Sequence, residues 1–261
     1  AAVLNQLLEK EFDARMKRTA DRPLPSGRIT PTVALMLGAA LSVVGLAWLL
    51  LAVNPLTAIL GAATWACYVA VYTPLKRLTV LNTVVGAVPG ALPPLMGWSA
   101  ATDSISAPGW ALFGILFFWQ LPHFMAIAWL YRDDYSGAGF KMLSGVDPDG
   151  RRTAASAVRN TIALMGVSLF PFQFGLVGHL YLAGAVLLGI GFLLPAVVFA
   201  RTLTARASRR LFFASILYLP LLLGLLVVDK RVPSLTSRGT LTTTLPSLAA
   251  PGTSPAEGFT N

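Results

Sequence analysis

Three oxygen-bearing side chains recur at four-residue intervals near the start of the chain. They are Asn5, Glu9 and Asp13, in the stretch NQLLEKEFDARMKRTADRPLPSGR. On an α-helix this spacing places them within roughly 80° of one another, which predicts one polar stripe. Such oxygen ligands suit Mg²⁺, which usually keeps waters and substrate phosphates in its other positions. The alternative is a polar helix end that meets lipid headgroups.

A second acidic segment, HFMAIAWLYRDDYSGAGFKML, begins at His123 and carries Asp133 and Asp134. His123 and Asp134 are about three helical turns apart, so they are predicted to share one face of a helix. Carboxylates at the end of an apolar helix are costly and favour a functional role. Tyr135 and Lys141 follow as further candidates for substrate binding. The alternative for His123 is a core histidine that is hydrogen-bonded to a neighbouring helix.

Basic residues accompany both acidic segments. Arginine can contact phosphate through two hydrogen bonds and lysine acts as a point charge. Carboxylates mixed with such cations suggest a site for Mg²⁺ and a polyphosphate. The candidates are Arg18, Arg22, Lys76 and Arg77. For each one taken singly, a preference of positive loops for one side of a membrane is an alternative explanation.

Aromatic side chains are frequent near the same segments. They suit either a belt at the membrane interface or the shielding of a carbocation by ring faces. The residues are Trp65, Tyr68, Tyr72, Phe117, Phe118, Trp119 and Trp129.

The amino-acid composition indicates that these residues lie in a membrane protein. Of the 261 residues, 55% are hydrophobic and 12% are charged, whereas soluble domains carry about a quarter charged residues. Apolar runs of about 20 residues indicate membrane-spanning helices rather than barrel strands. The fold class is therefore an all-α polytopic bundle, with spans predicted at 32–53, 55–73, 80–101, 108–131, 155–175, 177–200 and 210–228.

All but three of the 20 Lys and Arg residues lie in or beside every second connecting loop. This alternation predicts that these loops, and both acidic segments with them, face the cytoplasm, or the matrix in a mitochondrial protein. It also explains most of the net charge of +9, so no nucleic acid is expected as a partner. The single Cys67 excludes an internal disulfide and a CxxCH haem attachment.

The two ends of the chain differ in character. The sequence opens inside an apolar stretch without Met, and residues 1–13 resemble the last turns of a helix, so we expect an N-terminally truncated chain. From residue 232 it is rich in Ser, Thr, Pro and Gly, which predicts a disordered tail. The expected organisation is a transmembrane domain at 1–231 and a tail at 232–261.

Four stretches together resemble the intramembrane prenyltransferases of the UbiA superfamily, and within it the branch that farnesylates haem. They are NQLLEKEFDARMKRTADRPLPSGRITP, YTPLKRLTVLNTVVGAVPGALPPLMGW, FFWQLPHFMAIAWLYRDDYSGAGFKML and SRRLFFASILYLPLLL. The resemblance implies a bundle of nine helices in the full protein, about seven full and one partial here. Its first acidic motif maps onto Asn5, Glu9 and Asp13. The second reads DxxxD in quinone-forming relatives, whereas this chain has Leu130 and Asp134 at those positions.

The resemblance implies Mg²⁺-dependent transfer of a farnesyl group from farnesyl diphosphate to a vinyl group of haem B. The products are haem O and diphosphate, on the route to the haem A or haem O of terminal oxidases. Haem B is thus a substrate, and Mg²⁺ is the cofactor. Catalysis and metal binding are expected of Asn5, Glu9, Asp13 and Asp134. Substrate binding is expected of Arg18, Arg22, Lys76, Arg77, His123, Asp133, Tyr135 and Lys141.

The implied setting is a bacterial inner membrane or the mitochondrial inner membrane, with the active site on the cytoplasmic or matrix side. A haem A synthase or terminal-oxidase assembly factors are candidate partners beside the lipid bilayer. Three other functions stay open at this point. They are a prenyltransferase for a quinone precursor or a chlorin, a secondary transporter, and a non-catalytic haem-binding or assembly subunit.

Overall fold

The computed structural model describes residues 1–231, which fold as helices joined by short loops. The predicted tail at 232–261 lies outside the described residues. The long helices are α3 (Pro31–Ala52), α4 (Pro55–Ala66), α6 (Asn82–Thr102), α7 (Ala107–Leu130), α9 (Arg151–Val167), α11 (His179–Thr202) and α12 (Ala205–Val228). The short ones are α1 (Ala2–Leu8), α2 (Lys10–Asp13), α5 (Thr73–Leu78), α8 (Arg132–Gly137) and α10 (Phe170–Gln173).

Six helices within residues 1–231 are long and apolar enough to cross a membrane, the second of them running from Pro55 to Leu78 through a π-helical segment. They match six of the predicted spans within a few residues, except that α12 begins five residues early and the span predicted at 55–73 continues five residues further, to Leu78. The predicted span at 155–175 is instead divided into α9, which has 17 residues, and α10. Pro171 explains the division, because it lacks the N–H that would bond to the carbonyl of Val167, where α9 ends.

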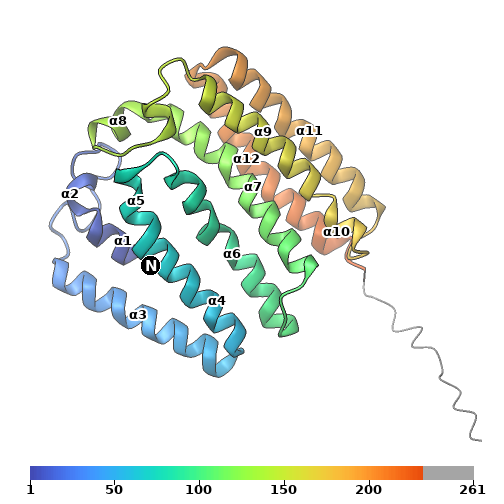
Figure 1. Ribbon diagram of the computed structural model, residues 1–261, viewed down its shortest axis with the longest axis horizontal. Coiled ribbons are helices and arrows are strands. Elements are labelled where there is room, and N and C mark those ends of the chain that lie inside the picture. Colours follow the sequence, from blue (N-terminus) through green and yellow to red (C-terminus); the bar gives the residue numbers. More distant parts are fainter. Residues whose placement is uncertain (232–261) are drawn as a thin grey trace, which may run out of the picture. The chain divides into compact units, whose positions relative to one another are not determined.

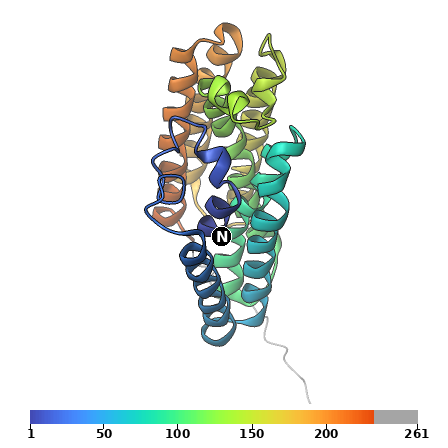
Figure 2. The ribbon, with the colours of Figure 1, turned by 90° about the vertical axis from the view of Figure 1, so that its left-hand side faces the viewer.

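The helices α3, α4, α6 and α7 pack side by side in chain order, as Figure 1 shows. Beyond them α9, α11 and α12 complete a four-helix cluster with α7, and this cluster holds the main apolar core. Ile115, Leu164, Phe192 and Leu211 are fully buried there, one from each of these helices. The short helix α1 lies against α3 at the edge of the layer and is followed by α2, and Figure 2 views the bundle from that side.

Successive long helices alternate in direction, so the loops form two groups at opposite ends of the bundle. One end carries the loops 14–30, 79–81, 131–150 and 203–204 together with the predicted excess of cations. At the other end the described residues include only Lys230 and Arg231 as Lys or Arg. Along the sides, apolar residues of α3 such as Met36, Trp48 and Leu51 are widely exposed. Such a surface requires lipid, so the chain is an integral multi-pass membrane protein.

Two helix breaks occur within the acidic segments. Between α1 and α2, Glu9 has φ −105° and ψ 7°, which bends the predicted continuous helix. Between α7 and α8, Tyr131 has φ −115° and ψ 26°. The prediction that His123 and Asp134 share a helical face is therefore wrong, because His123 lies in α7 and Asp134 in α8.

Candidate functional site

A cavity of about 170 Å³ lies at the cation-rich end of the bundle, where the N-terminal segment meets α5 and α8. Seven of the predicted site residues line it: Asn5, Glu9, Asp13, Arg18, Arg22, Lys76 and Tyr135. The first three side chains are almost fully buried, with exposures of 6%, 3% and 2%. Because buried carboxylates are rare unless paired, the partners of these groups decide what the cavity can bind.

Asn5 is held by an irregular stretch of the α4–α5 helix. Its amide donates to Thr73 Oγ1 at 3.1 Å, and Thr73 in turn donates to the carbonyl of Tyr68 at 2.9 Å. The segment Cys67–Tyr72 is a π-helix, a widening that occurs often at functional sites. With its amide nitrogen bonded to Thr73, Asn5 keeps its amide oxygen as an acceptor or ligand.

Glu9 forms a buried ion pair with Lys76 of α5. Lys76 Nζ lies 2.9 Å from Oε1 and 3.0 Å from Oε2, and only the Oε2 contact has hydrogen-bond geometry. Oε1 is therefore a buried acceptor that has no hydrogen bond among residues 1–231. Lys76 also stands over the ring of Tyr72, 4.6 Å from its centroid. That ring is in close contact with Gly86 of α6, where an added Cβ would lie 2.3 Å from a ring carbon.

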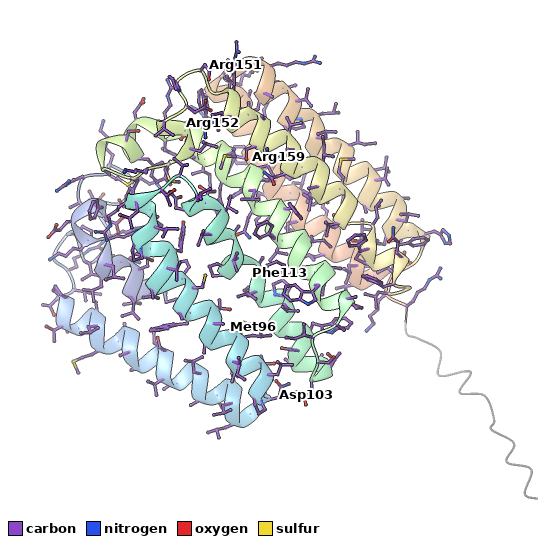
Figure 3. All side chains as sticks on the ribbon, in the orientation of Figure 1. Met96, Asp103, Phe113, Arg151, Arg152 and Arg159 are labelled. Carbon is purple, nitrogen blue, oxygen red and sulfur yellow. The ribbon has the colours of Figure 1, made fainter. Side chains whose placement is uncertain are left out.

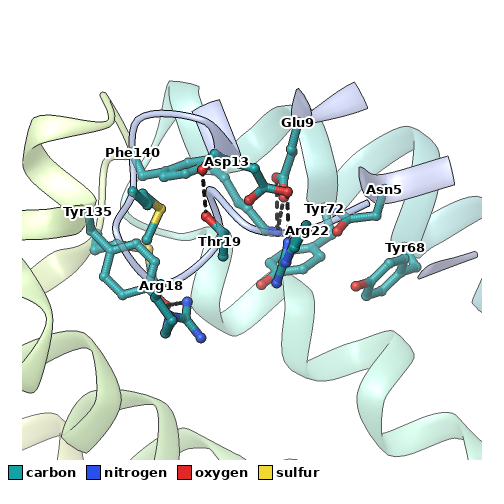
Figure 4. A pocket seen from close by; sticks show the side chains of 13 residues that line it. Asn5, Glu9, Asp13, Arg18, Thr19, Arg22, Tyr68, Tyr72, Tyr135 and Phe140 are labelled. Carbon is teal, nitrogen blue, oxygen red and sulfur yellow. Dashed lines mark hydrogen bonds and ion pairs between the residues drawn. The ribbon is translucent and has the colours of Figure 1, made fainter. Parts of the chain in front are cut away.

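Asp13 pairs with Arg22 from the loop that follows α2. Arg22 Nη1 donates to Asp13 Oδ2 at 2.8 Å, and Thr19 Oγ1 donates to the backbone carbonyl of Asp13 at 2.8 Å. The loop thus folds back over the acidic helix end, as Figure 4 shows. The Asp13 carboxylate and the Arg22 guanidinium are thus held together in the cavity wall, and the cavity itself stays open.

Arg18 reaches across the cavity to α8, where Nη2 donates to the Tyr135 hydroxyl at 3.0 Å. Burial raises the pKa of the Tyr135 phenol above its ordinary value, although Arg18 and Arg22 oppose the shift. The phenol therefore keeps its proton. Since Arg18 occupies a lone pair of this oxygen, the phenolic hydrogen is available for an anion in the cavity.

The loop after α8 forms one wall of the cavity. Gly139 has φ +86°, a conformation that favours glycine, and the turn brings Phe140 against Met16. The Lys141 amide donates to the carbonyl of Lys76 at 2.8 Å, which attaches the wall to α5. In the sequence, this wall could have been predicted from the SGAG turn and the apolar residues that follow it.

Five predicted site residues do not line the cavity. Asp133 points outward, with its side chain 97% exposed, and the Lys141 side chain is also exposed. Arg77 donates to the carbonyl of Leu8 at 3.2 Å and covers the ring of Phe12. Asp134 is half-buried, and its carboxylate has no hydrogen bond or ion pair within residues 1–231.

His123, the fifth of these residues, lies deeper along α7 and bonds to α12. The Ser215 hydroxyl donates to the carbonyl of Phe212 at 2.5 Å, so Ser215 Oγ accepts from His123 Nδ1–H at 2.7 Å. This leaves Nε2 as the ring nitrogen with a free lone pair. The ring stacks on Trp119 and approaches Phe212, with centroids 5.2 and 5.0 Å away. The hydrogen bond to a neighbouring helix is the one expected of a core histidine.

A second cavity, also of about 170 Å³, adjoins the first through Arg18, which lines both. We call it the acceptor groove. It runs between α7 and α12, and its other lining residues are Ala126, Ile127, Leu130, Tyr131 and Phe212. Ile127 lies one turn above His123 on α7, and Phe212 contacts the His123 ring. The groove therefore leads from the polar cavity towards His123.

Several residues that line the polar cavity are not among the predicted site residues. Tyr68 and Tyr72 were noted as aromatic residues without an assigned site, and Thr19, Met16 and Met142 were not noted. All five line the polar cavity. The i, i+4 spacing of the two tyrosines, just before the YTPLKR stretch with Lys76, is the signal that could have included them.

The polar cavity fits a divalent cation with a phosphate ligand better than a cation alone. Its lining holds two carboxylates and the Asn5 amide oxygen, and Glu9 Oε1 lacks a hydrogen bond. In residues 1–231, no three His, Cys, Asp or Glu side chains form a ready-made metal cluster. Mg²⁺ commonly takes one or two carboxylates and completes its shell with water and substrate phosphates. Three cations in the same lining would favour that phosphate.

Comparison with known proteins agrees with this geometry. Residues 1–228 match the UbiA prenyltransferase family. A protoheme IX farnesyltransferase from Solibacter usitatus is 50% identical over 229 residues, which cover 88% of this chain and 78% of the relative. One from Opitutus terrae is 49% identical over 88% of this chain and 78% of its own length. The mitochondrial protoheme IX farnesyltransferase of Arabidopsis thaliana is 43% identical over 87% of this chain and 53% of its own length.

Solved structures share the fold at low sequence identity. A digeranylgeranylglyceryl phosphate synthase superimposes with a TM-score of 0.72 at 18% identity, over 87% of this chain and 79% of that one. A UbiA homologue from Aeropyrum pernix K1 gives 0.67 at 19% identity, over 87% and 83%. The helical arrangement, the sequence match over 228 residues and the relatives at up to 50% identity lead to one conclusion: this chain belongs to the UbiA prenyltransferase family.

Proposed function

We propose that this protein transfers a farnesyl group from farnesyl diphosphate to a vinyl group of haem B, with Mg²⁺, and releases haem O and diphosphate. The observation that carries the proposal is the polar cavity, in which Glu9 and Asp13 hold Lys76 and Arg22 in ion pairs. The names of relatives at 43–50% identity support haem B as the acceptor and farnesyl as the group transferred.

The cations of the cavity bind the diphosphate. Arg18, Arg22 and Lys76 bring three positive charges to a lining with two carboxylates, so the lining has a net positive charge. Charge-assisted hydrogen bonds from these groups stabilise the negative charge that grows on the diphosphate as the allylic C–O bond breaks. The Tyr135 hydroxyl adds a neutral donor. Because these groups are already held by partners, little reorganisation is needed when charge develops.

Asn5, Glu9 and Asp13, with Asp134 from α8, are the residues that would hold Mg²⁺. The metal supplies further neutralisation of the leaving diphosphate. The chain's own contribution is to bury two carboxylates that balance two cations before substrate arrives. Loss of either carboxylate would leave Arg22 or Lys76 without its partner and disturb the diphosphate site at the same time.

Ionisation leaves an allylic cation, which the haem vinyl group attacks. Water then adds to the new cation beside the pyrrole and loses a proton, so atoms and charge balance. The face of Tyr72 carries the Lys76 ammonium at 4.6 Å, so this ring already interacts with a positive charge. Ring faces of Tyr68 and Tyr72 are suited to stabilise the allylic cation in the same way.

The acceptor groove is the place we propose for haem B. It shares Arg18 with the diphosphate cavity, so a molecule in the groove lies beside the breaking bond. The free Nε2 lone pair of His123 is a ligand for haem iron or an acceptor at the haem edge. We expect His123→Ala to weaken haem B binding, measured by its visible absorption, while His179→Ala, at the other end of the bundle, leaves it intact. Equal haem affinity in both variants would remove His123 from the site.

The orientation in the membrane follows from the cation-rich end of the bundle. Positive loops stay on the cytoplasmic side, or the matrix side in mitochondria, so the polar cavity opens there. We propose a bacterial or mitochondrial inner membrane as the location, consistent with bacterial and mitochondrial relatives. Haem O made at this site would pass to a haem A synthase or to the assembly of a terminal oxidase.

The experiment uses membranes that contain the protein, supplied with haem B, farnesyl diphosphate and Mg²⁺. Mass spectrometry should detect hydroxyethylfarnesyl haem, and EDTA should abolish it. A parallel reaction with 4-hydroxybenzoate tests a quinone precursor as the acceptor. A prenylated benzoate without a haem adduct would replace the proposed acceptor, and no adduct with either acceptor from folded protein would reject prenyl transfer to both.

A further inference from the structure

A groove of about 360 Å³ lies outside the catalytic cavities, between α6, α7 and α9. Its floor is α7, represented by the buried Leu121 and Met125, and its walls are the start of α6 and the first half of α9. Both walls pack against α7 but make little contact with each other. We call this hollow the α6–α9 groove.

The α6–α9 groove and the diphosphate cavity are on opposite sides of one loop. Met142 lines the cavity, whereas the next residue, Leu143, lines the groove. No residue lines both. The groove is therefore a separate site, and its own lining residues determine what it can bind.

Arg152 and Arg159 give the groove its charge. They are seven residues apart on α9, about two turns, and both line the groove, as Figure 3 shows along that helix. Both are exposed, and neither guanidinium has an ion pair or hydrogen bond among residues 1–231. By contrast, Arg151 on the same turn as Arg152 pairs with Asp149 at 3.3 Å.

Nearby carboxylates do not compensate these two arginines. Asp147 is buried and accepts hydrogen bonds from the backbone N–H and the hydroxyl of Thr153, at 2.7 and 2.8 Å. Asp149 is paired with Arg151. The positive charges of Arg152 and Arg159 thus both face the α6–α9 groove. Arg159 lies about 12 Å along α9 from the first residue of that helix.

Apolar residues continue from the two arginines down the groove. Leu81, just before α6, and Val84 of α6 are 60% and 46% exposed beside it, and Leu121 lies about 14 Å before the end of α7. Cations at the rim of a groove that also has exposed apolar side chains suit a molecule with an anionic head and hydrocarbon tails. A small soluble anion would leave the apolar part uncovered.

We infer that the α6–α9 groove binds an anionic phospholipid, whose phosphate contacts Arg152 and Arg159 and whose acyl chain covers the exposed Leu81 and Val84. Basic pockets between transmembrane helices on the cytoplasmic or matrix side hold such headgroups in other membrane proteins. Arg159 lies about two turns into α9 and has no partner among residues 1–231, so a bound phosphate would balance its charge. The inference is independent of the reaction proposed above.

The test is native mass spectrometry of the full chain in detergent, with phosphatidylglycerol added at graded concentrations. The wild type should retain phosphatidylglycerol in preference to phosphatidylcholine. The variant Arg152→Gln/Arg159→Gln should bind phosphatidylglycerol about 25-fold more weakly, since each cation near a membrane surface contributes about a factor of five.

Arg201→Gln/Arg206→Gln is the matched control, because it removes two exposed cations from the same end of the bundle without touching the groove. This control should retain phosphatidylglycerol like the wild type. Equal retention by the Arg152/Arg159 variant, equal loss in the control, or equal binding of phosphatidylcholine would overturn the inference. Displacement of the lipid by free glycerol phosphate at similar concentration would show a phosphate site without lipid selectivity, and would overturn it as well.

Discussion

The two acidic segments look alike in sequence but differ sharply in structure. In the N-terminal segment Glu9 and Asp13 are buried, and each holds a cation from another part of the chain. In the second segment Asp133 is exposed and pairs only with its chain neighbour Arg132, at 3.6 Å, while Asp134 is half-buried without a partner among residues 1–231. The first segment is thus assembled before any ligand arrives, whereas in the second the Asp134 carboxylate is unpaired within residues 1–231.

This contrast indicates that the two acidic segments have different roles. Paired, buried carboxylates fix the positions of Arg22 and Lys76 and form part of the wall of the polar cavity. A free carboxylate beside that cavity can join a metal only when metal and substrate are bound. If this division is correct, substitutions in the first segment should affect both structure and activity, and substitutions in the second should affect activity alone.

The largest effect is expected from Asp13→Asn. The change removes a metal ligand and the partner of Arg22 while keeping the shape of the side chain, so activity should fall at least about a hundredfold. Turnover in membranes measures it, with Glu11→Gln as the control because Glu11 is exposed and does not line the cavity. Comparable rates for the two variants would contradict the role given to the N-terminal segment.

Lys76→Met tests whether the first segment is held by its ion pairs. Glu9 would be left buried without its cation, which costs about 3–5 kcal/mol for a buried pair. We expect a clear fall in the unfolding temperature in detergent, beyond that of Lys17→Met, which removes an exposed lysine. Restored stability in Lys76→Met/Glu9→Gln would attribute the loss to the unpaired carboxylate, and no loss in the single variant would refute the pairing.

Asp134→Asn tests the second segment. Activity should fall by about tenfold through weaker metal binding, in the range usual for lost metal-site contacts. The required Mg²⁺ concentration should rise, and the unfolding temperature should stay unchanged because no intramolecular bond is lost. Asp133→Asn should lose less, since its side chain points outward. If Asp133→Asn lost more activity than Asp134→Asn, Asp133 rather than Asp134 would be the metal ligand.

The smallest effect is expected at Asp147, an acid after the second segment whose bonds are all within the protein. Burial raises the pKa of Asp147, but hydrogen bonds from Thr153 outweigh this effect and the pKa lies below its ordinary value. Because the folded-state pKa is lowered, the stabilisation is present above the unfolded-state pKa and is lost as pH falls through the folded-state pKa.

At neutral pH, Asp147→Asn should therefore lower the free energy of unfolding by about 1 kcal/mol, because hydrogen bonds to a neutral amide oxygen are weaker than those to a carboxylate. The difference from the wild type should narrow as the pH falls below the ordinary range of an aspartate. Thermal unfolding at neutral and acidic pH measures both values. A difference that grows in acid would mean that Asp147 is not held as a carboxylate.

Much of the fold was predictable because membrane spans are determined by length and apolarity. Six spans and the cation-rich end follow from patterns that one sequence displays. The division at Ser168 and the helix break at Tyr131 were not predicted. The first follows from Pro171, whose effect was overlooked, while the second has no Pro or Gly at the break and reflects tertiary contacts such as that of Arg18 with Tyr135.

The site was predictable in composition but only partly in geometry. The spacing of Asn5, Glu9 and Asp13 correctly predicted that these side chains converge, even though the helix bends at Glu9. Their pairing with Lys76 and Arg22 depends on how a loop and a distant helix fold back, which no local pattern encodes. The roles assigned to these residues stay predictions until they are tested.

The most direct test of the central claim is Mg²⁺-dependent binding of farnesyl diphosphate without the acceptor. Calorimetry with purified protein would compare the wild type, Asp13→Asn and Glu11→Gln, each with Mg²⁺ and with EDTA. The account predicts binding to the wild type and to Glu11→Gln only with Mg²⁺, and little binding to Asp13→Asn. Binding of equal strength to Asp13→Asn, or binding that EDTA does not weaken, would contradict it.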